Sequence, residues 1–427
     1  MTGRYWIETL GCPKNEVDSD KLVGTLTADG MVVAASPEDA DLVVVNTCAF
    51  IESARQESID TVLALADQAV DARVVVTGCM AERYGNELAD ALPEVDAVSG
   101  FGVPVSLGRK PDLTNGDDRD GLPAFDLLNL PRPSSDRPWA YVKIAEGCDR
   151  NCGFCAIPTF RGPQRSRSHT SILDEVRGLD VQEVVLVAQD LAAFGRDQGH
   201  GERSIVQLVG EVRELVERVR LLYLYPSDLT EELIQAILAT GVPYFDLSLQ
   251  HVSRPLMRRM RRWGDGERFL ERINHIRSIA PEASFRSNFI VGYPGETEDD
   301  HDALLDFIEQ AQLDWCGFFA YSLEDGTYAA DLDGQVDAGL VNERLRELTE
   351  LQDQITAARR DALIGETVTV LVDSQGIGRS HREAPEIDGI IHVPDDLIVG
   401  SMQQVAIVGA MGPDLIAQGA SAEDASW

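Results

Sequence analysis

Three cysteines lie within one short run of the chain, Cys148-Asp-Arg-Asn-Cys152-Gly-Phe-Cys155. Thiolates at offsets of four and three residues can converge on one metal centre from a single loop. On a cubane 4Fe–4S cluster, three thiolates leave one iron without a protein ligand, so a substrate or cofactor can bind metal there. Structural zinc is the alternative, but it normally takes four ligands and no fourth Cys or His follows closely. The spacing therefore favours an iron–sulfur cluster with one open iron.

A second set of cysteines, Cys12, Cys48 and Cys79, is spread along the N-terminal part of the chain. Each follows a run that is typical of a strand: ETLGC, VVNTC and VVTGC. Because the carboxyl ends of parallel strands share one edge of a sheet, the three thiols can meet there. We expect them to hold a second 4Fe–4S cluster with an open iron; buried structural thiols are the alternative. Cys316, in the apolar run WCGFFAYS, is expected in the core.

The elements around the N-terminal cysteines alternate between strand and helix patterns. Apolar, β-branched runs at 4–12, 41–48 and 72–79 predict strands, and residues 15–30 and 51–69 have helical periodicity. This β–α–β–α–β order predicts an α/β domain with a doubly wound parallel sheet.

A longer alternation begins at Ala140 and surrounds the CxxxCxxC run. Strands are expected at 140–147, 183–190, 220–226, 244–251, 284–294 and 315–322, with helical segments between them. Six β–α units predict a partial (βα)6 barrel, since a complete barrel has eight. The cysteine run begins where the first of these strands ends, on the barrel face that carries active sites.

Short strands between Gly, Pro and Asp turns follow the barrel and predict a small five-stranded β-barrel. A Pro-, Gly- and Asp-rich stretch ahead of the barrel predicts a linker with a short ordered piece near 125–130. We therefore expect an N-terminal domain at 4–115, a linker at 116–133, a barrel at 134–364 and a C-terminal β-barrel at 366–427.

The sequence EGCDRNCGFCAIPTFRG, placed after a strand, resembles the signature of the radical S-adenosylmethionine superfamily. The resemblance implies that the open iron binds the methionine part of S-adenosylmethionine and that reductive cleavage releases a 5′-deoxyadenosyl radical. It also implies that Phe154 lies against the adenine, and that Gly292, Pro294 and Gly295 in NFIVGYPGET lie against the nucleoside. Loop packing for Phe154 and a simple turn before a helix for the glycines are the alternatives.

Over nearly its full length the chain resembles the methylthiotransferase family, which joins a three-cysteine α/β domain, a radical barrel and a small TRAM or OB-like barrel. Enzymes of this family insert sulfur into a C–H bond and cap it with methyl. The resemblance implies two 4Fe–4S clusters and S-adenosylmethionine as both radical source and methyl donor. It also implies an electron donor and a sulfur donor as partners, while the protein positions these groups and excludes water.

Two branches of this family differ in substrate. One modifies an adenosine of tRNA, and the other, the RimO type, modifies the β-carbon of an aspartate in small-subunit ribosomal protein twelve. The strings TLGCPKNEVDSD, LYLYPSDL and GRSHREAPEIDG resemble the second branch, whereas the tRNA branch usually has Gln-Met-Asn where this chain has Pro13-Lys14-Asn15. A tRNA methylthiotransferase and a two-cluster electron carrier stay as alternatives, although a carrier needs neither an open iron nor a substrate cavity.

The chain is strongly acidic, with 72 Asp and Glu against 37 Lys and Arg and a formal net charge of −35. Residues 365–427 contain ten acidic residues and two arginines. An acidic barrel suits a basic ribosomal protein better than RNA, which needs a basic face and stacking aromatics. We expect this barrel to dock the ribosomal substrate; acidity that serves solubility alone is the alternative. Without a secretory leader or a membrane-length apolar run, the chain is expected in the cytoplasm with no membrane partner.

Overall fold

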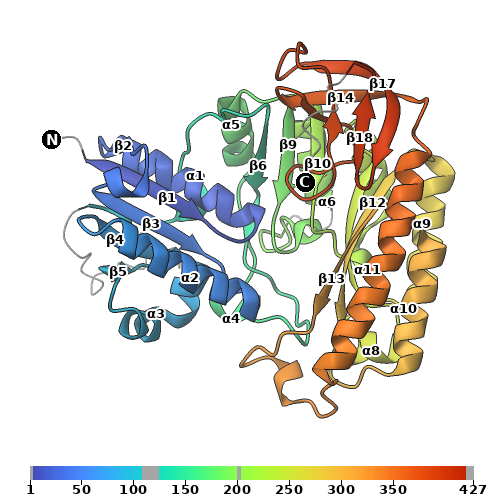
Figure 1. Ribbon diagram of the computed structural model, residues 1–427, viewed down its shortest axis with the longest axis horizontal. Coiled ribbons are helices and arrows are strands. Elements are labelled where there is room, and N and C mark those ends of the chain that lie inside the picture. The colour runs from blue at the N-terminus through green and yellow to red at the C-terminus, as the bar shows by residue number, and fades with distance from the viewer. Residues whose placement is uncertain (1–2, 108–124, 200–202, 420–427) are drawn as a thin grey trace. The chain divides into compact units, whose positions relative to one another are not determined.

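The computed structural model describes residues 3–107, 125–199 and 203–419 (Figure 1). Residues 108–115 of the expected N-terminal domain, 116–124 of the expected linker and 420–427 of the expected C-terminal barrel lie outside the described residues. The chain divides into two compact units. The first comprises Met1–Ser134, Tyr141–Arg150 and Cys155–Gly178, and the second comprises Ser135–Ala140, Asn151–Phe154 and Leu179–Trp427.

The first unit is built on a five-stranded parallel sheet with the strand order β2-β1-β3-β4-β5. Its strands are β1 (Arg4–Thr9), β2 (Val32–Val33), β3 (Leu42–Thr47), β4 (Arg73–Gly78) and β5 (Ala97–Val98). Its helices and 3-10 turns are α1 (Pro13–Ala28), η1 (Pro37–Asp39), α2 (Glu52–Gln68), α3 (Cys79–Ala91), η2 (Leu127–Asn129), α4 (Ile157–Arg161) and α5 (His169–Leu179). The predicted doubly wound α/β fold is confirmed, whereas the short edge strands β2 and β5 were not predicted.

The central strand β3 is apolar on both faces, as helices on both sides of a parallel sheet require. Val43 and Val45 belong to one buried core cluster, and Leu42 and Val44 belong to another. All four side chains are fully buried. Successive residues of the strand therefore enter opposite layers, and the uninterrupted apolar run follows from that requirement.

Six strands form the larger part of the second unit. They are β6 (Trp139–Lys143), whose first residues belong to this unit, β9 (Glu183–Val187), β10 (Arg218–Leu221), β11 (Tyr244–Gln250), β12 (Ser284–Val291) and β13 (Trp315–Ala320). They form two three-stranded sheets, in the orders β10-β9-β6 and β11-β12-β13, and a parallel bridge between Leu224 and Leu247 connects the two. The predicted partial (βα)6 barrel is confirmed, with a break between its third and fourth strands.

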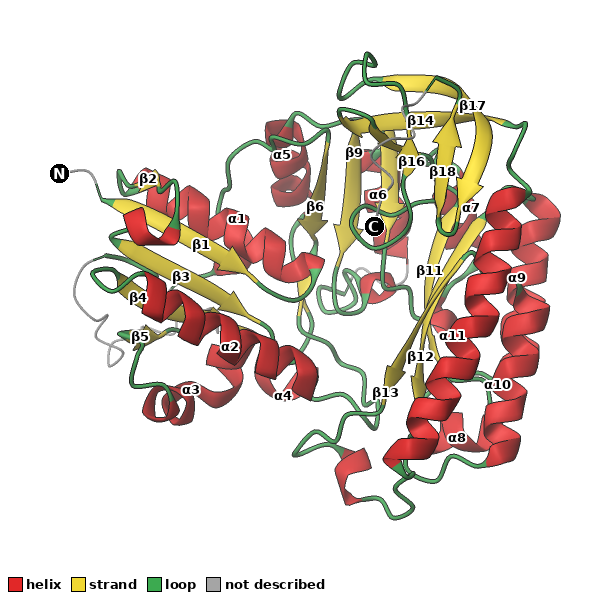
Figure 2. Ribbon diagram, in the orientation of Figure 1, coloured by secondary structure: helices red, strands yellow, loops and turns green. Residues whose placement is uncertain are grey.

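Helices cover the outer side of this barrel. They are α6 (Arg203–Val212), α7 (Glu231–Leu238), α8 (Arg254–Arg259), α9 (Gly266–Ile279), α10 (Glu298–Ala311) and α11 (Ala338–Asp361), with short turns η3 (Leu191–Ala193), η4 (Pro226–Asp228) and η5 (Tyr328–Asp331). Figure 2 shows α9, α10 and α11 side by side on one flank of the β11–β13 sheet. None of the described helices combines the length and the apolar character needed to cross a lipid bilayer.

The C-terminal part of the second unit is a closed five-stranded barrel with the order β14-β15-β16-β18-β17. Its strands are β14 (Thr367–Ser374), β15 (Ile377–Arg379), β16 (Ile391–His392), β17 (Met402–Met411) and β18 (Asp414–Ala417). Val370, Val372 and Ile407 are fully buried in its core. The predicted small five-stranded barrel is therefore confirmed.

Residues 379–388 of the C-terminal barrel, which we call the base segment, cover the amino ends of the radical-barrel strands. Tyr244 is the first residue of β11, and its hydroxyl donates to Asp388 at 2.6 Å. Trp315 is the first residue of β13, and its Nε1 donates to the Arg382 carbonyl at 2.7 Å. The string GRSHREAPEIDG thus has a structural task, because it closes the end of the barrel opposite the carboxyl ends of the strands.

A buried ion network holds the base segment to β9 and β10. Glu183, the first residue of β9, pairs with Arg220 at 2.8 Å and with Arg379 at 3.3 Å. Glu183 and Arg220 have side chains with no exposed area, and that of Arg379 is 2% exposed. Burial would raise the pKa of Glu183, but the neighbouring arginines lower it to about 2.

We expect Glu183→Gln to lower the free energy of unfolding by about 3–5 kcal/mol, because it leaves two arginines buried without their carboxylate. Urea denaturation measures this change. Because the pKa of Glu183 is lowered, its stabilising effect is present above the usual carboxyl pKa and is lost as the pH falls towards 2.

The matched control is Glu386→Gln, which removes an exposed ion pair with Arg137. That change should cost less than about 1 kcal/mol, because solvent screens the pair. Equal costs for the two variants would contradict the structural importance assigned to Glu183.

Candidate iron–sulfur sites

The three N-terminal cysteines lie at the carboxyl ends of three neighbouring strands. Cys12 follows β1 and precedes α1, Cys48 directly follows β3, and Cys79 directly follows β4 as the first residue of α3. Because these strands are adjacent and parallel, the three positions share one edge of the sheet. The predicted convergence on one edge is therefore present, and the role of the thiols as iron ligands stays a prediction.

Gly11 lets the loop after β1 pass close to Cys48. A Cβ at position 11 would lie 2.8 Å from Cys48 Cβ and 3.0 Å from Cys48 Sγ. The φ of Gly11 is 97°, in a region that residues with a side chain rarely adopt. Position 11 therefore requires glycine, because the loop that carries Cys12 passes so close to Cys48 that a side chain would not fit.

Asn15, in the first turn of α1, connects all three of these loops. Its side chain is fully buried. The Nδ2 group donates to the Leu10 carbonyl at 2.9 Å and to the Thr47 carbonyl at 3.0 Å. The Oδ1 atom accepts from Cys79 Sγ at 3.5 Å and from Arg161 Nη2 at 2.9 Å. One amide therefore fixes the backbone before Cys12, the backbone before Cys48 and the thiol of Cys79.

Arg161, at the end of α4, brings a buried positive charge to the same sheet edge. Its Nη2 donates to Cys79 Sγ at 2.9 Å, and its Nη1 donates to Glu146 Oε1 at 2.6 Å. The guanidinium carbon lies 4.5 Å from the centroid of the Phe101 ring. Only 3% of the Arg161 side chain is exposed. The charge is therefore shared between a carboxylate and a cysteine sulfur.

Burial and nearby cations act in opposite directions on the thiols. Burial raises the pKa of Cys48 to about 12, and it also raises the pKa of Cys79 although Arg161 opposes the effect. Burial would likewise raise the pKa of Cys12, but Lys14 and Arg161 outweigh it and lower that pKa. Metal ligands must be thiolates, so bound iron would displace the protons that remain.

The second set of cysteines lies in the loop between β7 (Ala145–Glu146) and α4. The backbone N–H of Cys148 donates to the Gly162 carbonyl at 3.1 Å. Cys148 Sγ in turn accepts from the backbone N–H of Arg150 at 3.4 Å. The first bond fixes the backbone at the start of the loop, and the second gives Cys148 Sγ an N–H donor.

Arg262 supplies a donor to the next cysteine of this loop. Its Nη1 donates to Cys152 Sγ at 3.1 Å, and its Nη2 donates to the Ser248 carbonyl. The guanidinium carbon lies 4.3 Å from the centroid of the Tyr225 ring. The neighbouring Gly153 donates its N–H to the Met260 carbonyl at 2.8 Å, which fixes the loop near the end of α8.

Gly292, Pro294 and Gly295, which are predicted to contact S-adenosylmethionine, form the turn after β12. The backbone N–H of Gly292 donates to Glu296 Oε2 at 2.6 Å. Gly292 has a φ of 80°, and a Cβ there would lie 2.4 Å from Val341 Cγ2. The turn and its packing are thus enough to require glycine at 292. Contact of these residues, and of half-buried Phe154, with the nucleoside stays a prediction.

Cys316 differs from the other six cysteines in its surroundings. It is half-buried and lines a cavity of about 570 Å³ together with Arg286, Gln352 and Asp388. The core position expected for Cys316 is therefore met only in part, because β13 is an edge strand of its sheet and leaves the residue half-buried.

Comparisons with known proteins cover almost all of the chain. Family models match at residues 4–100 (uncharacterized protein family UPF0004), 142–308 (radical SAM superfamily) and 364–419 (TRAM domain). The ribosomal protein uS12 methylthiotransferase RimO of Cutibacterium acnes is 42% identical over 97% of each chain. The protein of the same name from Moorella thermoacetica is 43% identical over 92% of this chain and 93% of that relative. The chain belongs to the RimO family of methylthiotransferases.

Among solved structures, the radical S-adenosylmethionine methyltransferase TsrM of Kitasatospora setae superposes with a TM-score of 0.53. It is 16% identical and the match covers 75% of this chain and 72% of TsrM. At this identity the likeness shows a shared fold alone.

The cofactors of this RimO family member are S-adenosylmethionine and two 4Fe–4S clusters, and its cysteine sites fit such clusters. No three His, Cys, Asp or Glu side chains within 3–107, 125–199 and 203–419 are close enough together to hold a single metal ion. In a cubane each thiolate binds a different iron, so wider spacing is expected there. Each set also includes a sulfur that accepts an N–H bond from an arginine, which suits an anionic ligand.

The sequence did not single out three polar residues of these sites. The sequence places Asn15 in the run Pro13-Lys14-Asn15 without indicating a role at the cysteines, and it indicates no role for Arg161 or Arg262. Each acts on a cysteine far away in sequence, so no local spacing could have identified it. The available signal was the position of Arg161 six residues after Cys155, within EGCDRNCGFCAIPTFRG.

We expect Asn15→Ala to lower the free energy of unfolding of the iron-free protein by about 1–3 kcal/mol, because the buried Thr47 carbonyl and the partly buried Leu10 carbonyl lose their donor. It should also lower the iron retained after desalting. Urea denaturation and iron analysis measure the two effects. The control is Gln68→Ala at the exposed end of α2, which should change neither. An Asn15→Ala protein as stable as its parent would show that the amide is dispensable.

Proposed function

We propose that this chain is a radical methylthiotransferase that adds a methylthio group to the β-carbon of an aspartate in small-subunit ribosomal protein twelve. The observation that carries the proposal is a pair of three-cysteine sets, one at the strand ends of the N-terminal sheet and one in the loop after β7, in a chain that matches RimO relatives over nearly its whole length. The same substrate implies action in the cytoplasm.

Six cysteines would hold the clusters in this proposal. Cys148, Cys152 and Cys155 would bind the cluster that takes S-adenosylmethionine on its open iron, and Cys12, Cys48 and Cys79 would bind the auxiliary cluster. When bound, these groups supply the one-electron chemistry, the sulfur atom and the methyl group. Phe154 and the turn at 292–295 would position the nucleoside.

The domains of this enzyme would follow the boundaries expected from the sequence. The auxiliary cluster would belong to the domain at 4–115, and the linker would run from 116 to 133. The radical barrel would occupy 134–364, and the C-terminal barrel at 366–427 would bind the substrate.

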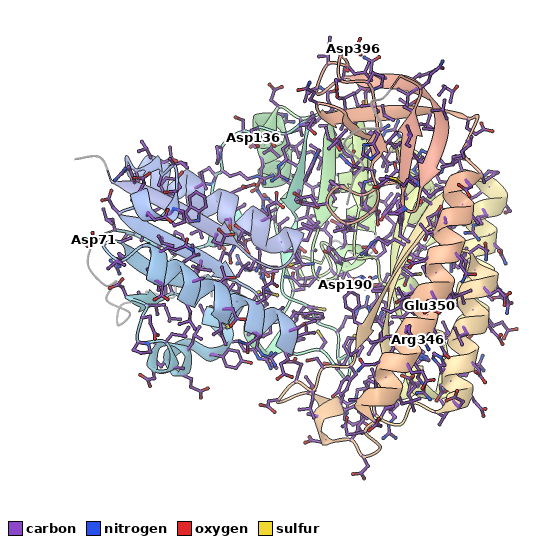
Figure 3. All side chains as sticks on the ribbon, in the orientation of Figure 1. Asp71, Asp136, Asp190, Arg346, Glu350 and Asp396 are labelled. Atoms are coloured by element: carbon purple, nitrogen blue, oxygen red, sulfur yellow. The ribbon has the colours of Figure 1, made fainter. Side chains whose placement is uncertain are left out.

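The exposed acidic residues of the C-terminal barrel support docking of a basic protein. Asp373, Glu383 and Asp388 are paired with arginines inside the second unit, so they are not available to a partner. Asp395 and Asp396, by contrast, are exposed after β16, and Asp396 is labelled in Figure 3 at the outer end of the barrel. This acidic pair would be the docking point.

The position of the base segment sets a length for the docked substrate. The C-terminal barrel lies at the amino ends of the radical-barrel strands, whereas the cysteine loop lies at the carboxyl ends. β12 has eight residues, which corresponds to about 26 Å at the usual rise per residue. A substrate held at Asp395 and Asp396 would therefore have to extend at least on the order of 25 Å to reach the cysteine loop.

Iron analysis with a cleavage assay tests the cluster assignment. The reconstituted protein should hold about eight irons, as expected for two four-iron clusters. Replacing Cys148, Cys152 and Cys155 by Ala should remove about half of the iron and all cleavage of S-adenosylmethionine. Replacing Cys12, Cys48 and Cys79 should remove the other half but leave uncoupled cleavage. Cys316→Ala is the control and should keep all the iron; full iron in either triple variant would refute that site.

Charge reversal tests the docking proposal. Asp395→Lys with Asp396→Lys should raise the KM for the ribosomal protein roughly 2–10-fold, as expected for two exposed ion pairs. The difference should shrink as salt rises, because screening weakens exposed pairs. Cleavage of S-adenosylmethionine without substrate should not change. Deleting 366–427 is less suitable, because it would also expose the buried charges under the base segment.

The matched control carries Asp67→Lys with Asp71→Lys, which changes the net charge equally at two exposed positions of the first unit. It should leave the KM unchanged. Mass spectrometry of the products identifies the modified molecule. A methylthio group on tRNA with the aspartate untouched would assign the chain to the tRNA branch instead.

A further inference from the structure

Two arginines contact one cysteine sulfur each, and the proposed reaction does not by itself require either of them. Arg161 donates to Cys79 Sγ at 2.9 Å within the first unit. Arg262 donates to Cys152 Sγ at 3.1 Å within the second unit. We propose that each arginine is a positioning residue that raises the reduction potential of one cluster, Arg161 that of the auxiliary cluster and Arg262 that of the radical cluster. The inference rests on the proposed function, because it presumes that the six cysteines hold clusters.

The charges of the ligands explain why a donor is needed. Three thiolates around a 4Fe–4S core of charge +2 leave a net charge of about −1, and one-electron reduction makes it about −2. A guanidinium bonded to a ligand sulfur stabilises the reduced form more than the oxidised form, because it attracts the larger negative charge more strongly. Loss of the arginine should therefore make reduction harder.

Arg161 is held in place by bonds that a simple packing role would not need. Its Nη1 is bound to Glu146 at 2.6 Å and its Nη2 to Asn15 at 2.9 Å, while the ring of Phe101 covers the guanidinium. Glu146 is itself held by Lys143 at 2.7 Å. The guanidinium therefore has little freedom to turn away from Cys79, and its orientation is set before any cluster binds.

Arg262 has different surroundings. Its further partners are the Ser248 carbonyl and the face of the Tyr225 ring. Among the residues that the structure describes, no carboxylate forms an ion pair with it. Its positive charge is therefore neutralised by neither Asp nor Glu, and Cys152 is its anionic partner once the thiol is deprotonated.

Potentiometric titrations on single-cluster proteins test the inference. The full chain with Cys148, Cys152 and Cys155 replaced by Ala keeps only the auxiliary site, and the chain with Cys12, Cys48 and Cys79 replaced keeps only the radical site. Arg161→Met and Arg262→Met are introduced into both, and each cluster is titrated with dithionite and followed by electron paramagnetic resonance. If the arginines had only a structural role, each substitution would not shift the reduction potential of one cluster and leave that of the other unchanged.

We expect Arg161→Met to make the auxiliary cluster harder to reduce and to leave the radical cluster unchanged, with the reverse result for Arg262→Met. A tenfold change in the ratio of reduced to oxidised cluster at a fixed potential corresponds to about 59 mV for one electron. Arg161→Lys and Arg262→Lys, which keep the charge without the planar fork, should shift in the same direction by less. They also supply the measurement where a Met variant does not retain its cluster.

The outcomes separate this inference from the function on which it rests. Parent proteins without four irons at either site would refute the cluster assignment itself. Clusters that bind normally but keep their potentials in the arginine variants would overturn the inference alone. Equal shifts of both clusters by one variant would also overturn it, because they would indicate a general change in the fold.

Discussion

Sulfur ligands that carry negative charge cannot be buried at the edge of an apolar sheet unless donors and positive charge are buried with them. The N-terminal sheet meets this constraint with two side chains. Asn15 donates to the backbone beside two cysteines, and Arg161 brings a guanidinium to Cys79. Glu146 and Lys143 then fix the arginine from behind. The constraint therefore extends from the sulfur atoms to Glu146, which holds Arg161, and to Lys143, which holds Glu146.

The base segment meets the same constraint at the other end of the radical barrel. The amino ends of the radical-barrel strands carry buried charges such as Glu183 and Arg220, so they need a cover that supplies partners. Arg379 and Asp388 make ion pairs with Glu183 and Arg286, and the backbone carbonyl of Arg382 accepts from Trp315. These pairs are buried, and their geometry requires particular residues rather than a general acidity. The string GRSHREAPEIDG, which resembles one branch of the family, therefore has a packing role inside the chain that does not depend on a substrate.

Local patterns in the sequence predicted most of the fold. Apolar runs such as 42–45 and 184–187 identified the strands, because a strand buried on both faces has few polar residues. The rule that parallel strands share a carboxyl edge then placed Cys12, Cys48 and Cys79 together. The break between β10 and β11 and the edge position of Cys316 depend on pairing between strands, which periodicity does not report. The roles of Arg161 and Arg262 could not be predicted from local patterns either, since each arginine contacts a cysteine sulfur at least 82 residues away in the sequence.

The bonds of Arg161 also show that residues on both sides of the CxxxCxxC run contribute to the surroundings of a cysteine in the N-terminal sheet. Glu146 stands two positions before Cys148, and Arg161 stands six positions after Cys155, yet both contact the network that ends at Cys79. Asp18 extends this network, since Lys143 pairs with it while bonding Glu146. A change at any of these charges would leave another buried without its partner, at a cost of about 3–5 kcal/mol. The segment from Lys143 to Arg161 is therefore constrained from two directions, by the cysteines it carries and by the sulfur of the N-terminal sheet that it supports.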